Sequence, residues 1–233
     1  MTNDPGTPGN GNWEINLASA ATIVHPTASY QIPQIDLNFG VGDRVQLTYE
    51  IPYVVQRTDG QPQETGWGNA NPGVKWRFFD QGEGGWQLST FPQLETSSSA
   101  SALEKGIAGP GPRLFLPLEA AKKIGSFDCD VEVGYFVPRR GPREQILGLV
   151  VGRSVTDKLE LDAEIYNDRA TDLPPNQTTL DMGGRYQFSP SFIALFMAGR
   201  SVGATAERQP VWVGYLGIQI LLSDYGRSLA PKH

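Results

Sequence analysis

Residues 39–53 read FGVGDRVQLTYEIPY, and this stretch holds a pattern that recurs along most of the chain. After a turn with two glycines, polar and apolar residues alternate without a break. A period of two puts alternate side chains on opposite faces of a β-strand. One face is apolar and ends in Tyr53, while the other carries full charges such as Arg44 and Glu50. A strand of this kind is typical of a barrel wall with lipid outside and water inside.

The recurring alternation predicts an all-β fold, a single antiparallel up-and-down transmembrane β-barrel of about 12 strands. A strand of about ten residues, tilted by about 40°, crosses the apolar layer of an outer membrane. The eighth, eleventh and twelfth strands leave their registers open, because their alternation is weak. The predicted strands cover residues 13–17, 34–40, 45–53, 74–78, 86–95, 113–119, 127–135, 145–153, 159–165, 180–187, 192–200 and 211–222.

The predicted connections alternate in length along the barrel, which occupies residues 12–222. Short turns at one rim and long loops at the other are typical of outer-membrane barrels, and an even strand number puts both termini on the short-turn side. Residues 1–11 are rich in Gly, Pro, Asn and Thr and are expected to be a flexible tail, with a second tail at 223–233. The short turns lie at 41–43, 80–85, 122–125, 155–158 and 189–191, and the long loops include 56–72, 97–111, 139–143 and 167–176.

Composition excludes several classes of protein. No run of 18 apolar residues exists, so no transmembrane helix is predicted. A net charge of −6 argues against nucleic acid as a partner. The single cysteine, Cys129, excludes an internal disulfide framework. The N-terminus lacks a signal peptide, so we interpret the sequence as a mature form with an added Met1 and expect a bacterial outer-membrane location.

The residues needed for catalysis or metal binding are scarce. His25 precedes a proline at a hairpin tip, and no nucleophile motif surrounds it or His233. One cysteine and one internal histidine offer too few ligands for a transition metal. Alternating carboxylates at 128–132 and 160–164 could suggest a Ca²⁺ site, but three on one strand face fit a wet lumen wall better. We therefore predict no catalytic residues, no cofactor and no metal.

Three segments carry a resemblance to a known family: FGVGDRVQLTYEIPY, NPGVKWRFF and LELDAEIY. They resemble a bacterial outer-membrane barrel family of the phenol-degradation meta-pathway "transporter" type, over about residues 12–222. The resemblance implies an outer-membrane barrel that takes up aromatic compounds, and it supplies no catalytic residues. The chain departs from the usual barrel pattern at its end, because Leu222 is followed by further residues without a terminal Phe.

The inward face of the predicted strands carries more acids than bases, so the lumen is expected to be rich in charged residues and unfavourable to anions. Long side chains from opposite walls are expected to leave at most a narrow channel. Buried charges are costly unless paired or hydrated, so most are expected to form ion pairs. The predicted lumen charges are Arg44, Glu50, Lys75, Arg77, Arg113, Asp128, Asp130, Glu132, Glu160, Asp162, Glu164, Arg185 and Arg200.

One aromatic cluster is predicted inside the lumen, formed by Phe91, Phe115 and Phe136. Proline lacks an N–H and weakens a strand ladder where it occurs. A weak seam in the outer half of the wall would leave the backbone around Pro92 and Pro117 unpaired, with one cavity touching Phe91 and Phe115, where an apolar ligand enters the lumen or leaves sideways into the membrane. In the simpler alternative, the prolines only shape the rim and the rings fill space. The predicted strand prolines are Pro33, Pro52, Pro92 and Pro117.

Two functions fit these predictions. The first is a channel or transporter for passive uptake of small neutral or aromatic, apolar molecules. The second is a barrel with a blocked lumen and a structural or ligand-holding role. A soluble lipocalin-like carrier fits less well, because its faces would have the opposite polarity. The expected partners are outer-membrane lipid or detergent and a small apolar or aromatic solute, while the oligomeric state stays open.

Overall fold

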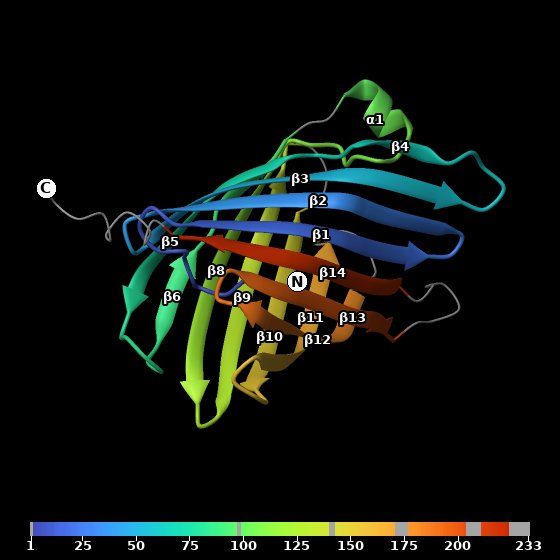
Figure 1. Ribbon diagram of the computed structural model, residues 1–233. Coiled ribbons are helices and arrows are strands. Elements are labelled where there is room, and N and C mark those ends of the chain that lie inside the picture. The colour runs from blue at the N-terminus through green and yellow to red at the C-terminus, as the bar shows by residue number, and fades with distance from the viewer. Residues whose placement is uncertain (1, 97–98, 140–142, 171–176, 204–210, 224–233) are drawn as a thin grey trace, which may run out of the picture.

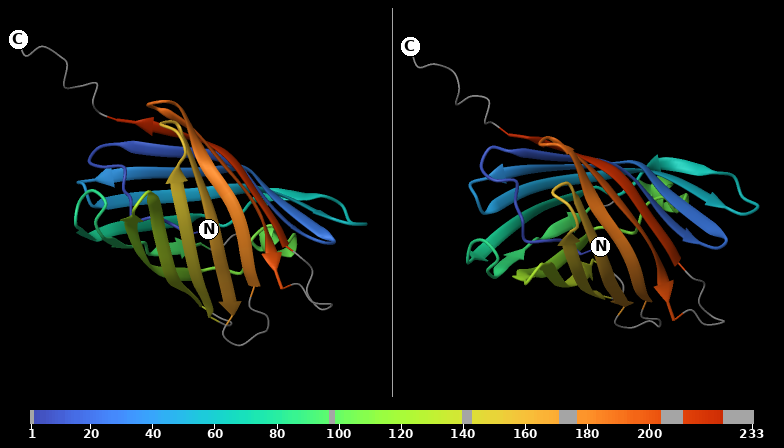
Figure 2. Two further views of the ribbon diagram at one scale, coloured as in Figure 1. Left: turned by 90° about the horizontal axis from the view of Figure 1, so that it is seen from below. Right: turned by 60° about the horizontal axis from the view of Figure 1, so that its bottom comes forward.

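The computed structural model describes residues 2–96, 99–139, 143–170, 177–203 and 211–223. The strands wrap into a closed antiparallel barrel, shown in Figures 1 and 2. Their bounds are β1 Trp13–Val24, β2 Thr27–Val41, β3 Val45–Thr58, β4 Glu64–Trp67, β5 Asn71–Asp80, β6 Gln87–Thr90, β7 Gln93–Glu95, β8 Arg113–Ile124, β9 Phe127–Pro138, β10 Glu144–Ser154, β11 Leu159–Ala170, β12 Gln177–Ser189, β13 Phe192–Val202 and β14 Val211–Leu222.

The wall of the described barrel has twelve strand positions, as the alternation predicts. Fourteen strands fill them, because β4 continues into β5 and β6 into β7. Each strand pairs with its neighbour in sequence, and β1 closes the barrel against β14 from Trp13↔Leu222 to Val24↔Val211. The predicted topology is confirmed, because the predicted turns after β2, β5, β8, β10 and β12 share one rim. The other rim holds the long loops together with the two-residue connection between β1 and β2.

The two faces of the wall have opposite polarity. Leu116 and Leu161 are 43% and 40% exposed on the outer face, whereas Glu119 and Glu132 are fully buried on the inner face. Burial of charge together with exposure of leucine reverses the usual soluble pattern. This arrangement confirms the predicted register and argues against the lipocalin-like alternative.

The burial of alternate side chains fixes the registers of the three strands that the sequence left undefined, β10, β13 and β14. In β10 Ile146 faces inward and Leu147 outward. In β13 Ile193 is buried while Phe192 is exposed, and in β14 Leu216 faces outward. Apolar residues inside the lumen explain why alternation alone could not fix these strands.

Two predicted long loops contain regular structure. Residues 56–72 include β4, which pairs with β3 from Tyr53↔Trp67 to Gln56↔Glu64. Residues 97–111 include the helix α1, Ala100–Glu104, capped by Ser99. The loop after α1 folds back so that Ile107 packs on Val54 of β3. Within the described residues, no helix is long and apolar enough to cross a membrane.

Candidate functional site: the barrel lumen

The lumen is occupied in part by the N-terminal segment, residues 2–11. Gly11 N–H donates to the Gly40 carbonyl and Gly40 N–H to the Asn12 carbonyl, so the chain enters beside the short-turn rim. From there it runs inward, and Pro5 is fully buried. This differs from the flexible tail that composition predicts, since the segment makes specific contacts across the barrel.

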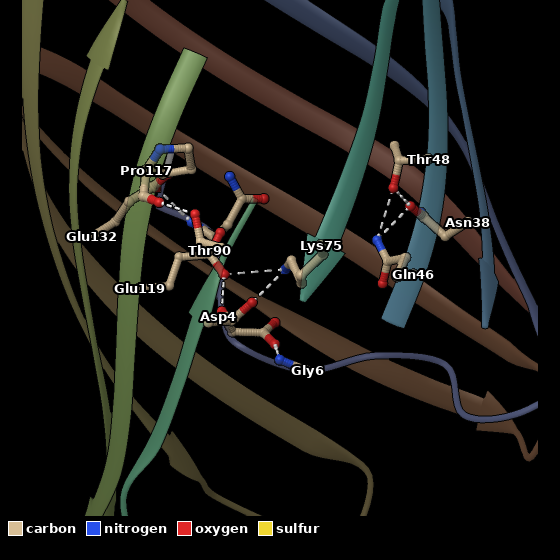
Figure 3. A network of polar contacts seen from close by, with 12 residues as sticks. Asp4, Gly6, Asn38, Gln46, Thr48, Lys75, Thr90, Pro117, Glu119 and Glu132 are labelled. Carbon is tan, nitrogen blue, oxygen red and sulfur yellow. Dashed lines mark hydrogen bonds and ion pairs between the residues drawn. The ribbon is translucent and has the colours of Figure 1, made fainter. Parts of the chain in front are cut away.

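Backbone groups of this segment bind lumen side chains. Thr2 N–H donates to Glu164 Oε1 on β11, and Asn3 N–H donates to Glu132 Oε2 on β9 at 2.9 Å. Lys75 Nζ on β5 donates to the Asp4 carbonyl, as Figure 3 shows. Three strands from different parts of the wall therefore hold one short segment, which narrows the lumen.

Most of the predicted lumen charges lie on the inner face, and several are paired. Lys75 Nζ lies 3.7 Å from Glu119 Oε2, and Arg185 Nε lies 3.3 Å from Glu160 Oε2. Arg77 pairs with Asp80 at 3.4 Å near the short-turn rim. The remaining inward-facing members are Glu50, Asp128, Asp130, Glu132, Asp162 and Glu164.

Two of the predicted lumen charges lie elsewhere. Arg200 was expected inside, but it is exposed on the outer face with its guanidinium 5.3 Å from the Trp212 ring centroid. Its neighbour Ser201 takes the inward position instead. The weak alternation in this strand concealed that register. Arg44 lies exposed in the turn before β3, outside the wall strands.

Arg113 lies at the long-loop rim. The sequence predicted it only as one of the lumen charges, without its partners. Its guanidinium donates to Glu95 at 2.7 Å and to Glu144 at 2.8 Å. It also lies 4.3 Å from the centroid of the Phe136 ring. Charge-assisted pairs of this geometry are among the stronger protein hydrogen bonds. Arg113 thus ties β7, β8 and β10 together above the aromatic rings.

The predicted aromatic cluster is divided between two places in the lumen. Phe115 and Phe136 stack with ring centroids 4.3 Å apart, and both line a cavity of about 210 Å³ together with Tyr166. Phe91 instead lines a larger cavity of about 650 Å³ and packs 4.8 Å from Lys75 Nζ. Phe91 and Phe115 thus line two cavities that share Asn3 and Gln93 in their walls, and Phe91 leans toward Lys75.

The wall is interrupted at a predicted proline. β6 ends at Thr90 and β7 begins at Gln93, with Pro92 in the gap. Against β8 the pairing runs to Thr90↔Leu118 and resumes at Gln93↔Phe115. Within this gap the Pro117 carbonyl accepts a hydrogen bond from the Thr90 hydroxyl at 2.7 Å. The hydrogen-bond ladder between β6–β7 and β8 is thus broken beside Pro92 and Pro117, where the seam was predicted. The Thr90 hydroxyl replaces part of it.

The other two strand prolines lie on the β2–β3 pair. The register of β2 against β3 shifts between Gln31 and Gln34, which brackets Pro33. Pro52 pairs with Gln34 just beyond this shift, and its carbonyl accepts from Gly68 N–H at 2.9 Å. Proline at a register shift is the usual arrangement, since a bulge tolerates the missing N–H.

Comparison with known proteins identifies the fold. The crystal structure of an outer membrane channel from Pseudomonas putida F1 matches with a TM-score of 0.71 and 12% identity, covering 95% of this chain and 99% of that one. A KdgM porin in complex with disordered oligogalacturonate matches with a TM-score of 0.61 and 9% identity, covering 89% of this chain and 98% of that one. The NanC porin matches with a TM-score of 0.61 and 7% identity, covering 88% of this chain and 98% of that one.

These likenesses establish the fold of an outer-membrane channel, since the identities are too low to carry more. No family model matches the chain. No curated protein matches it either. The barrel implied by the sequence resemblance is confirmed.

Proposed function

We propose that this protein is a channel of the bacterial outer membrane for passive uptake of small neutral or aromatic, apolar molecules. The observation that carries the proposal is the stacked pair of Phe115 and Phe136 beside a cavity in an otherwise charged lumen. Aromatic rings prefer such stacked partners, and a cavity of about 210 Å³ accommodates one small ring. The barrel fold of the similar structures supports the proposed location.

The expected path uses the seam in the wall. Phe115 belongs to β8, the strand whose pairing is interrupted beside Pro92 and Pro117. A solute that reaches the ring pair therefore lies next to a break in the backbone ladder of the wall. We propose that an apolar solute enters or leaves the lumen there, over the ring pair and past Glu95 and Glu132, which line the same cavity.

Replacing Phe115 tests this use of the ring pair. Phe115→Ala is expected to slow uptake of a one-ring aromatic solute into protein-containing vesicles roughly fivefold, since a ring contact contributes about 1 kcal/mol. Phe192→Ala removes the same ring from the outer face and should leave uptake unchanged. Both variants must show the heat-dependent gel mobility of a folded barrel. Uptake unaffected by Phe115→Ala would count against the proposal.

Ion selectivity provides a second test of an open lumen. Carboxylates on β9 and β11 outnumber the cations facing them, so any current should be carried mainly by cations. Screening shortens the reach of these charges, so the preference should weaken as salt rises. Reversal potentials in planar bilayers across a KCl gradient measure it. Anion preference at low salt would contradict the inward placement of the carboxylates.

A barrel with a blocked lumen remains the second candidate, and the N-terminal segment favours it. Residues 2–5 occupy the space that a permeant would need, and they are fixed by hydrogen bonds to three wall strands. In that case the protein would hold a ligand rather than pass one. Single-channel recording of the full chain distinguishes the two candidates, since a permanently blocked barrel shows no discrete openings.

A further inference from the structure

Three carboxylates on adjacent strands form what we call the carboxylate face: Glu14 on β1, Asp36 on β2 and Glu50 on β3. Strand register places Asp36 opposite Glu50 and opposite Asn16. All three carboxylates line the cavity of about 650 Å³, which also touches Asp4 of the N-terminal segment. It adjoins the cavity beside Phe115 and Phe136, with which it shares Asn3 and Gln93.

The carboxylate face lacks the ion pairs found elsewhere in the lumen. Two cations line the same cavity, but Lys75 pairs with Glu119 and Arg185 with Glu160, both outside the cavity lining. None of the ion pairs among the described residues includes a member of the carboxylate face. Partly buried charge without a direct ion pair is unfavourable, so a bound cation would stabilise this wall.

Hydrogen bonding on this wall leaves acceptors free. Asn16 and Asn38 each donate an amide N–H to Asp36 Oδ2 at 2.9 Å, and Gln34 donates to Glu50 Oε1 at 2.8 Å. These amide N–H groups therefore bond to other side chains of the wall. In the adjacent network shown in Figure 3, Gln46 and Thr48 likewise both donate to Asn38 Oδ1. Asn16 Oδ1 and Asp36 Oδ1 are buried and have no protein partner, and Asn16 is only 9% exposed.

We propose that this cavity binds a small organic cation with several N–H donors, such as an alkylammonium or guanidinium compound. Its charge would balance the carboxylate face, and its N–H groups would donate to the carboxylate oxygens that line the cavity. A bare metal ion fits less well, because no three acidic, His or Cys side chains of the described residues converge to hold one. The inference goes beyond the proposed uptake of neutral or apolar solutes.

Calorimetric titration of the full-length protein in a non-ionic detergent tests the proposal, with agmatine as the probe at low salt. Agmatine should bind, and sorbitol, a neutral polyol, should not. Asp36→Asn and Glu50→Gln keep the shape of each side chain and should each weaken agmatine binding about tenfold, the order of one charge pair. Asp162→Asn is the matched control, because Asp162 faces the lumen on β11 but does not line this cavity.

Three results would overturn the proposal: sorbitol binding as tightly as agmatine, unchanged affinity in both amide variants, or an equal loss in Asp162→Asn. The last would indicate attraction by the whole lumen rather than by a site. Heat-dependent gel mobility must show that each variant remains folded. Because binding in detergent needs no transport, a negative result would leave the proposed channel untouched, and a closed channel would leave this site testable.

Discussion

Deletion of residues 2–8 is expected to raise the single-channel conductance several-fold. These residues place Pro5 and the backbone of Thr2 and Asn3 inside the barrel, against carboxylates on β9 and β11. Removing them empties the space that they fill in the lumen without touching a wall strand. Planar bilayer recordings of the deleted and full-length chains at the same salt concentration give the comparison.

The control deletes residues 59–62 at the exposed tip between β3 and β4, which should leave the conductance unchanged. Both proteins should refold with equal yield, since neither deletion removes strand pairing. Equal conductance of the full-length chain and the chain without residues 2–8 would mean that the segment leaves the lumen in a membrane. The blocked-barrel candidate would then lose its support.

Leu161→Arg is expected to destabilise the barrel in lipid by about 2–4 kcal/mol, the cost of a cation at the centre of the apolar layer. Leu161 lies on the outer face of β11 and is 40% exposed there. Its neighbour Asp162 points into the lumen, where Glu160 and Glu164 are close in register. Asp162→Arg should therefore cost little or even relieve repulsion. Urea titrations in lipid vesicles measure both, and equal losses would show that β11 is misplaced by one residue.

The strand order and most registers could be predicted from the sequence because the two faces of the wall meet different solvents. Where both faces of a strand are apolar, the alternation does not define which residues face inward. The prediction that Arg200 faces the lumen was wrong for that reason. The short helix α1 lies in a Ser-, Ala- and Gly-rich stretch without periodicity. Its position depends on Ile107 packing against Val54, a contact that no local pattern reveals.

The placement of residues 2–11 was beyond sequence reasoning for a different reason. Their strongest contacts use backbone N–H and carbonyl groups, which every residue type offers, so composition gives no signal. Likewise, the charges alone predicted a paired lumen. They did not show that arginine and lysine would pair away from Asp36 and Glu50, because that depends on the register between nearby strands, which for example places Arg185 opposite Glu160.

The pairing of β1 with β14 has a consequence for the order in which this molecule assembles. These strands are farthest apart in the chain, yet they pair over their whole lengths. Contacts between distant segments carry the largest loop-closure cost and so tend to form late. Until then the growing sheet is open along one side. The segment attached to β1 can settle onto β9 and β11 during that interval, so the finished barrel encloses it as the wall closes.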